Sequence, residues 1–152
     1  MKYSLSVERA THMVIKEGVT LKMYDQDGGD VGNATIGIGH LIHTGRIDGR
    51  KSEEKFKKGL TKDQVVDLYL NDIAIREVSV NKSLKKLDLE VTQSQYEALV
   101  DIKYNLTGQY NKILKTLKKD GPEAAAKLVE SYNKKNKQLH LRRLENGKML
   151  RK

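Results

Sequence analysis

The sequence contains no cysteine and no tryptophan, and it has one proline among its 152 residues. Without cysteine there are no disulfides and no thiolate metal sites, a composition typical of synthesis in a reducing compartment. No apolar run is long enough to span a bilayer, and the first residues lack the apolar core of a signal peptide. We therefore expect no stable membrane insertion and accumulation in the cytoplasm.

The composition indicates a folded, basic protein. Its 38% hydrophobic content can fill a core, and its length fits one domain, with two lobes as an option. The formal net charge is +9, and residues 134–152 contain eight Lys/Arg against one acid, Glu145. Such a segment attracts polyanions such as an anionic cell envelope, or it is a solvated tail. Charge alone, without a reader motif, does not indicate nucleic-acid binding.

The first eighteen residues predict a helix. Ser4 or Ser6 can cap its start, and Gly18 is a natural end, which places Glu17 on the last turn. An apolar stripe is expected along its buried face: Val7, Ala10, Val14 and Ile15.

A β-hairpin and further helices follow. Residues 20–24 and 33–39 have strand-like patterns on either side of a loop at 25–33. Helix starts are predicted by two capping boxes and a Gly-Pro step: Thr61 with Gln64, Thr92 with Gln95, and Gly121-Pro122. The expected fold class is α+β in one domain, with a β-containing lobe at 18–60, a connecting helix at 61–80 and a helical lobe from 1–17 and 80–152.

The loop carries three aspartates, Asp25, Asp27 and Asp30. An EF-hand starting at Asp25 needs glycine at its sixth position and glutamate at its twelfth, but these positions hold Asp30 and Ile36. The pattern therefore does not predict an EF-hand, and weak Ca²⁺ binding by the three close carboxylates is the alternative metal site. Aspartate and glycine are also common turn residues, so an ordinary hairpin turn is the plain alternative.

Glu17 and an aspartate of this loop form a candidate catalytic pair. Glycoside hydrolysis needs one protonated carboxyl group that donates to the leaving oxygen and one ionised group that activates water or attacks carbon. The partial negative charge at a helix C-terminus favours the protonated acid, which suits Glu17. A wet, glycine-rich loop favours an ionised aspartate.

These residues carry a family resemblance. The segments EGVTLKMY (17–24) and GNATIGIGH (32–40) resemble the signature of phage-type lysozymes, the muramidases of glycoside hydrolase family 24. The segments QSQYEALVDIKYNLTG (93–108) and SYNKKNKQLHLRRLEN (131–146) are similar to later motifs of that family. The resemblance therefore spans most of the chain, in order, and implies the lysozyme-like fold.

The resemblance implies Glu17 as general acid, with Thr35 and a loop carboxylate holding the attacking water, and inversion at the anomeric carbon. The loop is about three residues longer than the family's turn, so its aspartate is not fixed by counting. Asp27 is our assignment because it lies between the counts from both ends, with Asp25 and Asp30 as alternatives.

Five further residues near the motifs have predicted roles. By resemblance Leu41 and Tyr104 contact saccharide, although Tyr104 also suits core packing. His40 is expected to be a structural hydrogen-bonding residue. Gly37 and Gly39 fit positions of close backbone approach.

The resulting hypothesis is a monomeric, cofactor-free muramidase that cuts the β-1,4 bond between N-acetylmuramic acid and N-acetylglucosamine in peptidoglycan. The basic C-terminal region would reach an anionic envelope. The lack of a signal peptide fits an endolysin that waits in the host cytoplasm until it is released to the cell wall, or a tail-associated or secretion-system domain. The alternative is a catalytically impaired peptidoglycan-binding module of the same fold.

Overall fold

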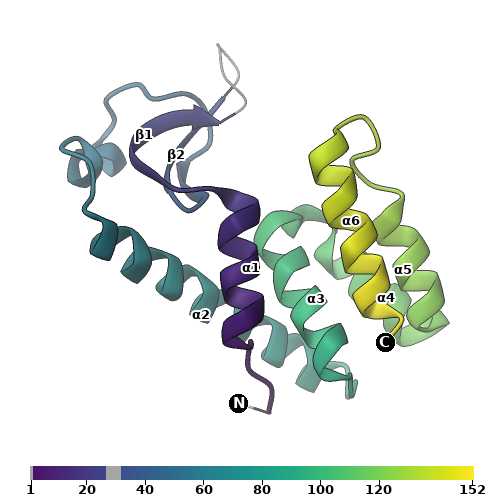
Figure 1. The fold of residues 1–152 in the computed structure, drawn as a ribbon. Coiled ribbons are helices and arrows are strands. Elements are labelled where there is room, and N and C mark those ends of the chain that lie inside the picture. The colour runs from purple at the N-terminus through teal and green to yellow at the C-terminus, as the bar shows by residue number, and fades with distance from the viewer. Residues whose placement is uncertain (1, 27–31) are drawn as a thin grey trace. The chain divides into compact units, whose positions relative to one another are not determined.

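The computed structural model describes residues 2–26 and 32–152, and combines a small sheet with many helices (Figure 1). The α+β class is therefore confirmed. The sheet is antiparallel with strand order β1-β2-β3. The elements are α1 (Val7–Glu17), β1 (Thr20–Gln26), β2 (Asn33–Gly37), β3 (His40–His43), the 3-10 helix η2 (Lys51–Phe56), α2 (Lys62–Lys86), α3 (Gln93–Asn105), α4 (Thr107–Asp120), α5 (Pro122–Glu130) and α6 (Lys137–Leu150).

The chain forms two compact units. The sheet unit is Ala10–Ala74, and the helical unit combines Met1–Arg9 with Ile75–Lys152. The chain thus starts in the helical unit, builds the sheet unit and then returns.

Local hydrogen bonds set the helix ends as the sequence predicts. The Ser6 hydroxyl oxygen accepts the Arg9 amide at 3.1 Å and caps α1. Gly18, with φ +74°, ends that helix by donating its amide to the Val14 carbonyl at 3.0 Å. Both predicted capping boxes form, each with a backbone–side-chain bond in both directions: Thr61 with Gln64, and Thr92 with Gln95.

In the sheet unit, β1 and β2 form the predicted hairpin with shifted boundaries. Pairing of Asp25 with Ala34 and of Gln26 with Asn33 extends β1 two residues beyond the predicted end. Strand β2 ends at Gly37, because Gly37 and Gly39 take positive φ values of +70° and +65° and the chain turns between them. The buried apolar side chains of this unit are Met13, Ala34, Ile36, Ile38, Phe56, Val65, Tyr69 and Ile73.

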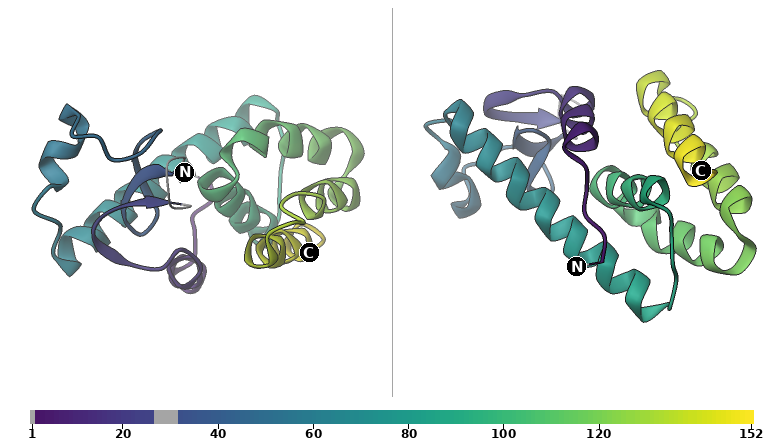
Figure 2. Two further views of the ribbon diagram at one scale, coloured as in Figure 1. Left: turned by 90° about the horizontal axis from the view of Figure 1, so that it is seen from above. Right: turned by 60° about the horizontal axis from the view of Figure 1, so that its bottom comes forward.

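The helical unit has a larger apolar core. Helix α3 packs on α4 and α6, and α5 packs between α4 and α6, as the views of Figures 1 and 2 show. Side chains from the C-terminal half of α2 join this core. Its buried members are Val80, Leu84, Tyr96, Ala98, Leu99, Val100, Ile102, Tyr110, Ile113, Leu114, Leu117, Ala125, Ala126, Val129 and Leu150.

The predicted apolar stripe of α1 is wrong at two of its four residues. Ala10 and Val14 are half-buried, but Val7 is 83% exposed and Ile15 is 74% exposed, whereas Arg9 and Met13 are buried. The reason is an ion pair across the helical unit: Arg9 Nη2 lies 3.3 Å from Asp101 Oδ2, and Arg9 Nη1 lies 2.9 Å from Glu145 Oε1. A long-range partner therefore makes an arginine a buried residue of this helix.

Asp101 is the centre of this buried ion network. Its carboxylate also accepts hydrogen bonds from Arg142 Nη2 at 2.6 Å and from Asn146 Nδ2 at 2.7 Å. Burial by itself would raise the pKa of Asp101, but the Arg142 and Arg9 guanidinium groups and the Asn146 amide outweigh it and hold the pKa below its usual value. Asp101 is therefore a charged residue inside the helical unit.

The basic C-terminal segment is less available than its composition suggests. Arg142 and Arg143 are buried. Arg151 pairs with Glu123 at 2.8 Å and with Glu130 at 2.6 Å. The exposed positive charge of residues 134–152 therefore comes mainly from lysines: Lys134, Lys135, Lys137, Lys148 and Lys152.

Candidate active site

Glu17, the predicted general acid, is the last residue of α1, and its carboxyl group lies against Gly39. A Cβ atom at Gly39 would stand 2.8 Å from Glu17 Oε2 and 3.3 Å from Glu17 Cδ. A Cβ atom there would push the Glu17 carboxyl group aside, and the φ of +65° at Gly39 also favours glycine. The predicted close approach at Gly39 is confirmed. The group that lies against Gly39 is the carboxyl group of Glu17, the candidate acid.

Thr35 lies in β2, the central strand of the sheet, and its side chain is fully buried. It pairs with Tyr24 on β1 and with Leu41 on β3. Its hydroxyl group donates a hydrogen bond to the Asn33 carbonyl at 2.8 Å. Because that hydrogen is used, the hydroxyl oxygen can offer only its lone pairs to a further partner.

The strand register separates Asp25 from Thr35. Directly paired residues point to the same face of a sheet and consecutive residues to opposite faces. Since Tyr24 pairs with Thr35 and Asp25 pairs with Ala34, the Asp25 side chain lies on the face opposite Thr35. There Asp25 Oδ1 accepts the Ile47 amide at 2.7 Å.

Two of the three candidate aspartates have no described position in the structure. Asp27, our sequence-based assignment, and Asp30 lie outside the described residues.

His40 is a structural hydrogen-bonding residue, as predicted. Its Nδ1 lies 2.7 Å from Asp72 Oδ2, and its ring centroid lies 5.9 Å from that of Phe56. Asp72 is a buried residue of α2 that sequence reasoning missed. An acid thirty-two residues away on a helix carries no local signal that links it to a strand histidine.

The two predicted saccharide contacts belong to different units. Leu41 is 49% exposed on β3 of the sheet unit, directly opposite Thr35 in the pairing. Tyr104 is half-buried on α3 of the helical unit, where the Arg76 guanidinium lies 5.3 Å from the centre of its ring. The sheet unit thus contains Glu17, Thr35 and Leu41, and Tyr104 is separate from it.

A sequence comparison decides the family. The model of the family described as phage lysozyme matches residues 15–148. The chain belongs to the phage lysozyme family. The matched range includes Glu17, Thr35, Leu41 and Tyr104, and the family resemblance seen in the sequence is confirmed.

Solved structures share the fold of this phage lysozyme. An endolysin from Escherichia coli O157:H7 phage FAHEc1 has a TM-score of 0.72 at 24% identity, over 99% of this chain and 94% of that one. The muramidase domain of SpmX from Asticaccaulis excentricus has a TM-score of 0.70 at 18% identity, over 98% of both chains. A mutant of P22 lysozyme has a TM-score of 0.65 at 24% identity, over the full length of both. These likenesses show the lysozyme-like fold.

Among curated proteins no relative matches the chain. Family membership makes this phage lysozyme a glycoside hydrolase that lyses peptidoglycan. Within the described residues, no helix has the length and apolar character needed to cross a bilayer.

Proposed function

We propose that this phage lysozyme hydrolyses the β-1,4 bond between N-acetylmuramic acid and N-acetylglucosamine with inversion at the anomeric carbon. Glu17 donates a proton to the glycosidic oxygen, and a loop aspartate with Thr35 holds the attacking water. The observation that carries the proposal is the placement of the Glu17 carboxyl group against Gly39, beside the strands that carry Thr35 and Leu41. Inversion requires room for a water between acid and base.

The role of Thr35 follows from its hydrogen bond. Its hydroxyl hydrogen is donated to the Asn33 carbonyl, so its oxygen would accept a hydrogen from the water. The loop carboxylate would accept the second hydrogen and act as the general base. The attacking lone pair of the water oxygen then points away from both groups.

Asp27 is the proposed carboxylate. The register supports this choice over Asp25, because Asp25 lies on the face opposite Thr35 and holds the Ile47 amide. Asp30 is the remaining alternative. Leu41 and Tyr104 are proposed to contact the saccharide, and the exposed C-terminal lysines to contact an anionic envelope.

The test of the acid is Glu17→Gln in an assay that follows the clearing of outer-membrane-permeabilised cells. Loss of general acid catalysis is expected to lower the clearing rate by about 10²- to 10⁴-fold. Lys16→Gln is a matched control on the same helix, since Lys16 is exposed. Normal clearing by Glu17→Gln would refute the enzymatic role of this residue.

The test of the base compares Asp25→Asn, Asp27→Asn and Asp30→Asn in the same assay. Asp27→Asn is expected to lose clearing, while Asp25→Asn keeps it as long as the protein stays folded. An active Asp27→Asn beside an inactive neighbour would move the role to that neighbour. NMR of the first product released from soluble glycan checks the stereochemistry, with the α-anomer expected from inversion.

If the wild type does not clear cells, sedimentation with purified peptidoglycan separates a wall-binding module of the same fold, which sediments with the wall, from an inactive preparation, which does not.

A further inference from the structure

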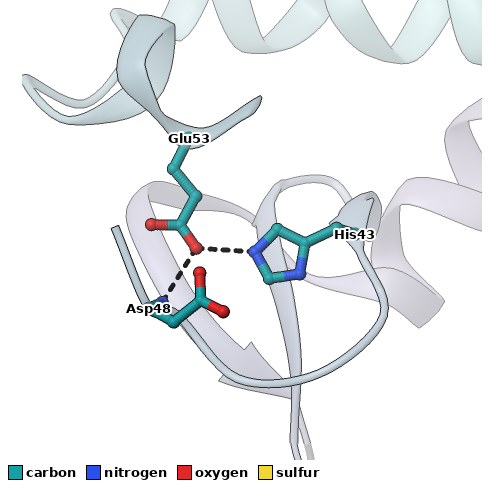
Figure 3. Close-up of side chains that lie close together, drawn as sticks. All are labelled: His43, Asp48 and Glu53. Atoms are coloured by element: carbon teal, nitrogen blue, oxygen red, sulfur yellow. Dashed lines mark hydrogen bonds and ion pairs between the residues drawn. The ribbon is translucent and has the colours of Figure 1, made fainter. Parts of the chain in front are cut away.

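His43, the last residue of β3, has a hydrogen-bond acceptor at each ring nitrogen, and Figure 3 shows the one on Glu53. Its Nδ1 lies 2.8 Å from the Thr44 carbonyl oxygen, and its Nε2 lies 2.6 Å from Glu53 Oε1. A carbonyl oxygen and an ionised carboxylate oxygen can only accept, so both contacts are satisfied together when both ring nitrogens carry a hydrogen. The geometry therefore suits a positively charged imidazolium.

Glu53, the partner on η2, is held as a carboxylate. It is 1% exposed, and its two oxygens accept the backbone amides of Asp48 at 3.0 Å and Gly49 at 2.8 Å. The hydrogen bond from His43, followed by that from the Asp48 amide, lowers the pKa of Glu53. His43 and Glu53 therefore form an ion pair shielded from solvent.

A metal ion is the rival occupant of this cluster. Ligand-type atoms of His43, Asp48 and Glu53 all lie within 4.8 Å of one another. However, Arg50 already binds the Asp48 carboxylate through Nε at 2.9 Å and through Nη2. A guanidinium at that position repels a second cation and uses the carboxylate lone pairs. The contacts therefore favour a hydrogen bond from protonated His43 to Glu53 over a bound metal ion.

The ion pair closes a segment that is bonded to both strands of the hairpin. The Gly45 carbonyl accepts the Ala34 amide at 2.8 Å, and the Gly45 amide donates to Asn33 Oδ1 at 2.8 Å. Two residues later the Ile47 amide donates to Asp25 Oδ1. Residues 44–53 thus support the strand positions that flank Thr35.

We propose that His43 and Glu53 form a pH-sensitive latch that fixes residues 44–53 to the hairpin while His43 is protonated and releases them when it is neutral. The charged groups that act on the ring are Glu53 from η2 and Asp48 and Arg50 from the connecting loop. On β2 the residue paired with His43 is the uncharged Ala34. The latch is independent of the proposed function.

The direction of the pH dependence follows from the pKa of His43. The hydrogen bonds to Glu53 and to the Thr44 carbonyl raise this pKa above its ordinary value of 6.5. A group whose pKa is raised by folding stabilises the fold fully below the unfolded pKa, and that contribution is lost as the pH rises through the folded pKa. Residues 44–53 should therefore loosen on the alkaline side.

The experiment is an NMR titration of the full chain from about pH 5 to pH 9, spanning the range in which histidines titrate. It follows the ring nitrogens of His43 and the hydrogen exchange of the Asp48 and Gly49 amides, corrected for intrinsic rates. His43 should stay doubly protonated above its ordinary pKa. The protection of these amides should then fall as His43 loses its proton. The fall should be about tenfold for each unit by which the pKa of His43 is raised.

Two variants make the test specific. Glu53→Gln removes the charge but keeps a side-chain oxygen, so it should lower the pKa of His43 and abolish the pH-dependent step in protection. Glu54→Gln changes an exposed neighbour and should leave both unchanged. The same titration on Glu17→Gln should match wild type, which separates failure of the latch from failure of the catalytic assignment.

Three results would overturn the latch. The first is a His43 that titrates at or below its ordinary pKa. The second is protection of Asp48 and Gly49 that does not change across the titration. The third is a shift of the His43 nitrogen signals together with increased protection on addition of Zn²⁺, which would assign the cluster to a metal ion.

Discussion

The helical unit and the sheet unit each bury acidic side chains, but they pair them differently. In the helical unit Asp101 is held by Arg9 and Arg142, which keep their charge at any pH that proteins tolerate. In the sheet unit the buried acids Glu53 and Asp72 are each paired with a histidine, His43 and His40. Histidine is the side chain that changes charge near neutral pH.

The ion pairs of the helical unit keep their charge across the working pH range, whereas a histidine ion pair can lose its charge there. The helical unit combines arginine-based ion pairs with a large apolar core, so its packing responds little to mild changes of pH. The sheet unit carries Glu17 at the end of α1 and Thr35 on β2, and it contains the His43–Glu53 ion pair, whose charge depends on the protonation of His43. The unit with the candidate catalytic residues is therefore the one that holds a pH-dependent ion pair.

The largest expected effect comes from breaking the arginine support. Arg142→Met leaves Asp101 short of its main partner in a buried site, which costs about 3–5 kcal/mol of unfolding free energy. Urea unfolding measures this loss. Lys148→Met on the exposed side of the same helix is the control and should change little. Equal effects of the two variants would contradict the comparison.

Gly39→Ala should damage activity more than stability. The added Cβ would displace the Glu17 carboxyl group, and misplacement of a catalytic group by about 1 Å costs about 10²-fold in rate. Gly49 has a similar positive φ, but a Cβ atom there meets no atom within 4 Å. Gly49→Ala therefore has the same backbone cost of about 1–2 kcal/mol in unfolding free energy, without a clash against a carboxyl group. Clearing assays and thermal unfolding of both variants separate these effects.

The two units should also respond to opposite ends of the pH scale. Because the pKa of Asp101 is lowered by folding, its contribution to stability is present above its unfolded pKa of about 3.9 and is lost as the pH falls through the folded value. Hydrogen exchange of helix α3 should therefore increase in acid. Asp101→Asn should remove this acid step, and a step of unchanged size in that variant would assign it to another group.

The smallest effects are expected at the two capping boxes, which allow the same change in both units. Thr61→Ala and Thr92→Ala each remove an N-cap side chain, at a cost of about 0.5–2 kcal/mol. The Thr92 bond is partly buried and the Thr61 bond is exposed, so the loss at Thr92 should be larger. Thermal unfolding of both variants checks the order, and the reverse order would speak against burial as the cause.

Features set by neighbouring residues could be predicted from the sequence. The capping boxes, the Gly18 stop and the hairpin depend on chemistry within a few residues, and all were found. The family motif was recognised because its residues lie close together in the sequence.

Features set by distant partners could not be predicted. A periodic pattern treats Arg9 as a surface residue, because its partner Asp101 has no local signature. Strand β3 and η2 were not predicted, because they lie in or beside a polar stretch without a periodic pattern of apolar residues. In this stretch the Glu53 carboxylate accepts hydrogen bonds from the backbone amides of Asp48 and Gly49, and such bonds have no signature in the apolar pattern. The loop aspartate stays open for a related reason: an insertion breaks the count that would identify it.

The pairing of Arg9 with Glu145 has a consequence for biosynthesis. A ribosome makes the N-terminal cation long before its partner, which lies 136 residues later in the chain. The whole sheet unit, Ala10–Ala74, emerges in between. Helix α1, which carries Glu17, is therefore synthesised well before Glu145, and the Arg9–Glu145 ion pair can form only after the later residues of the helical unit have been made.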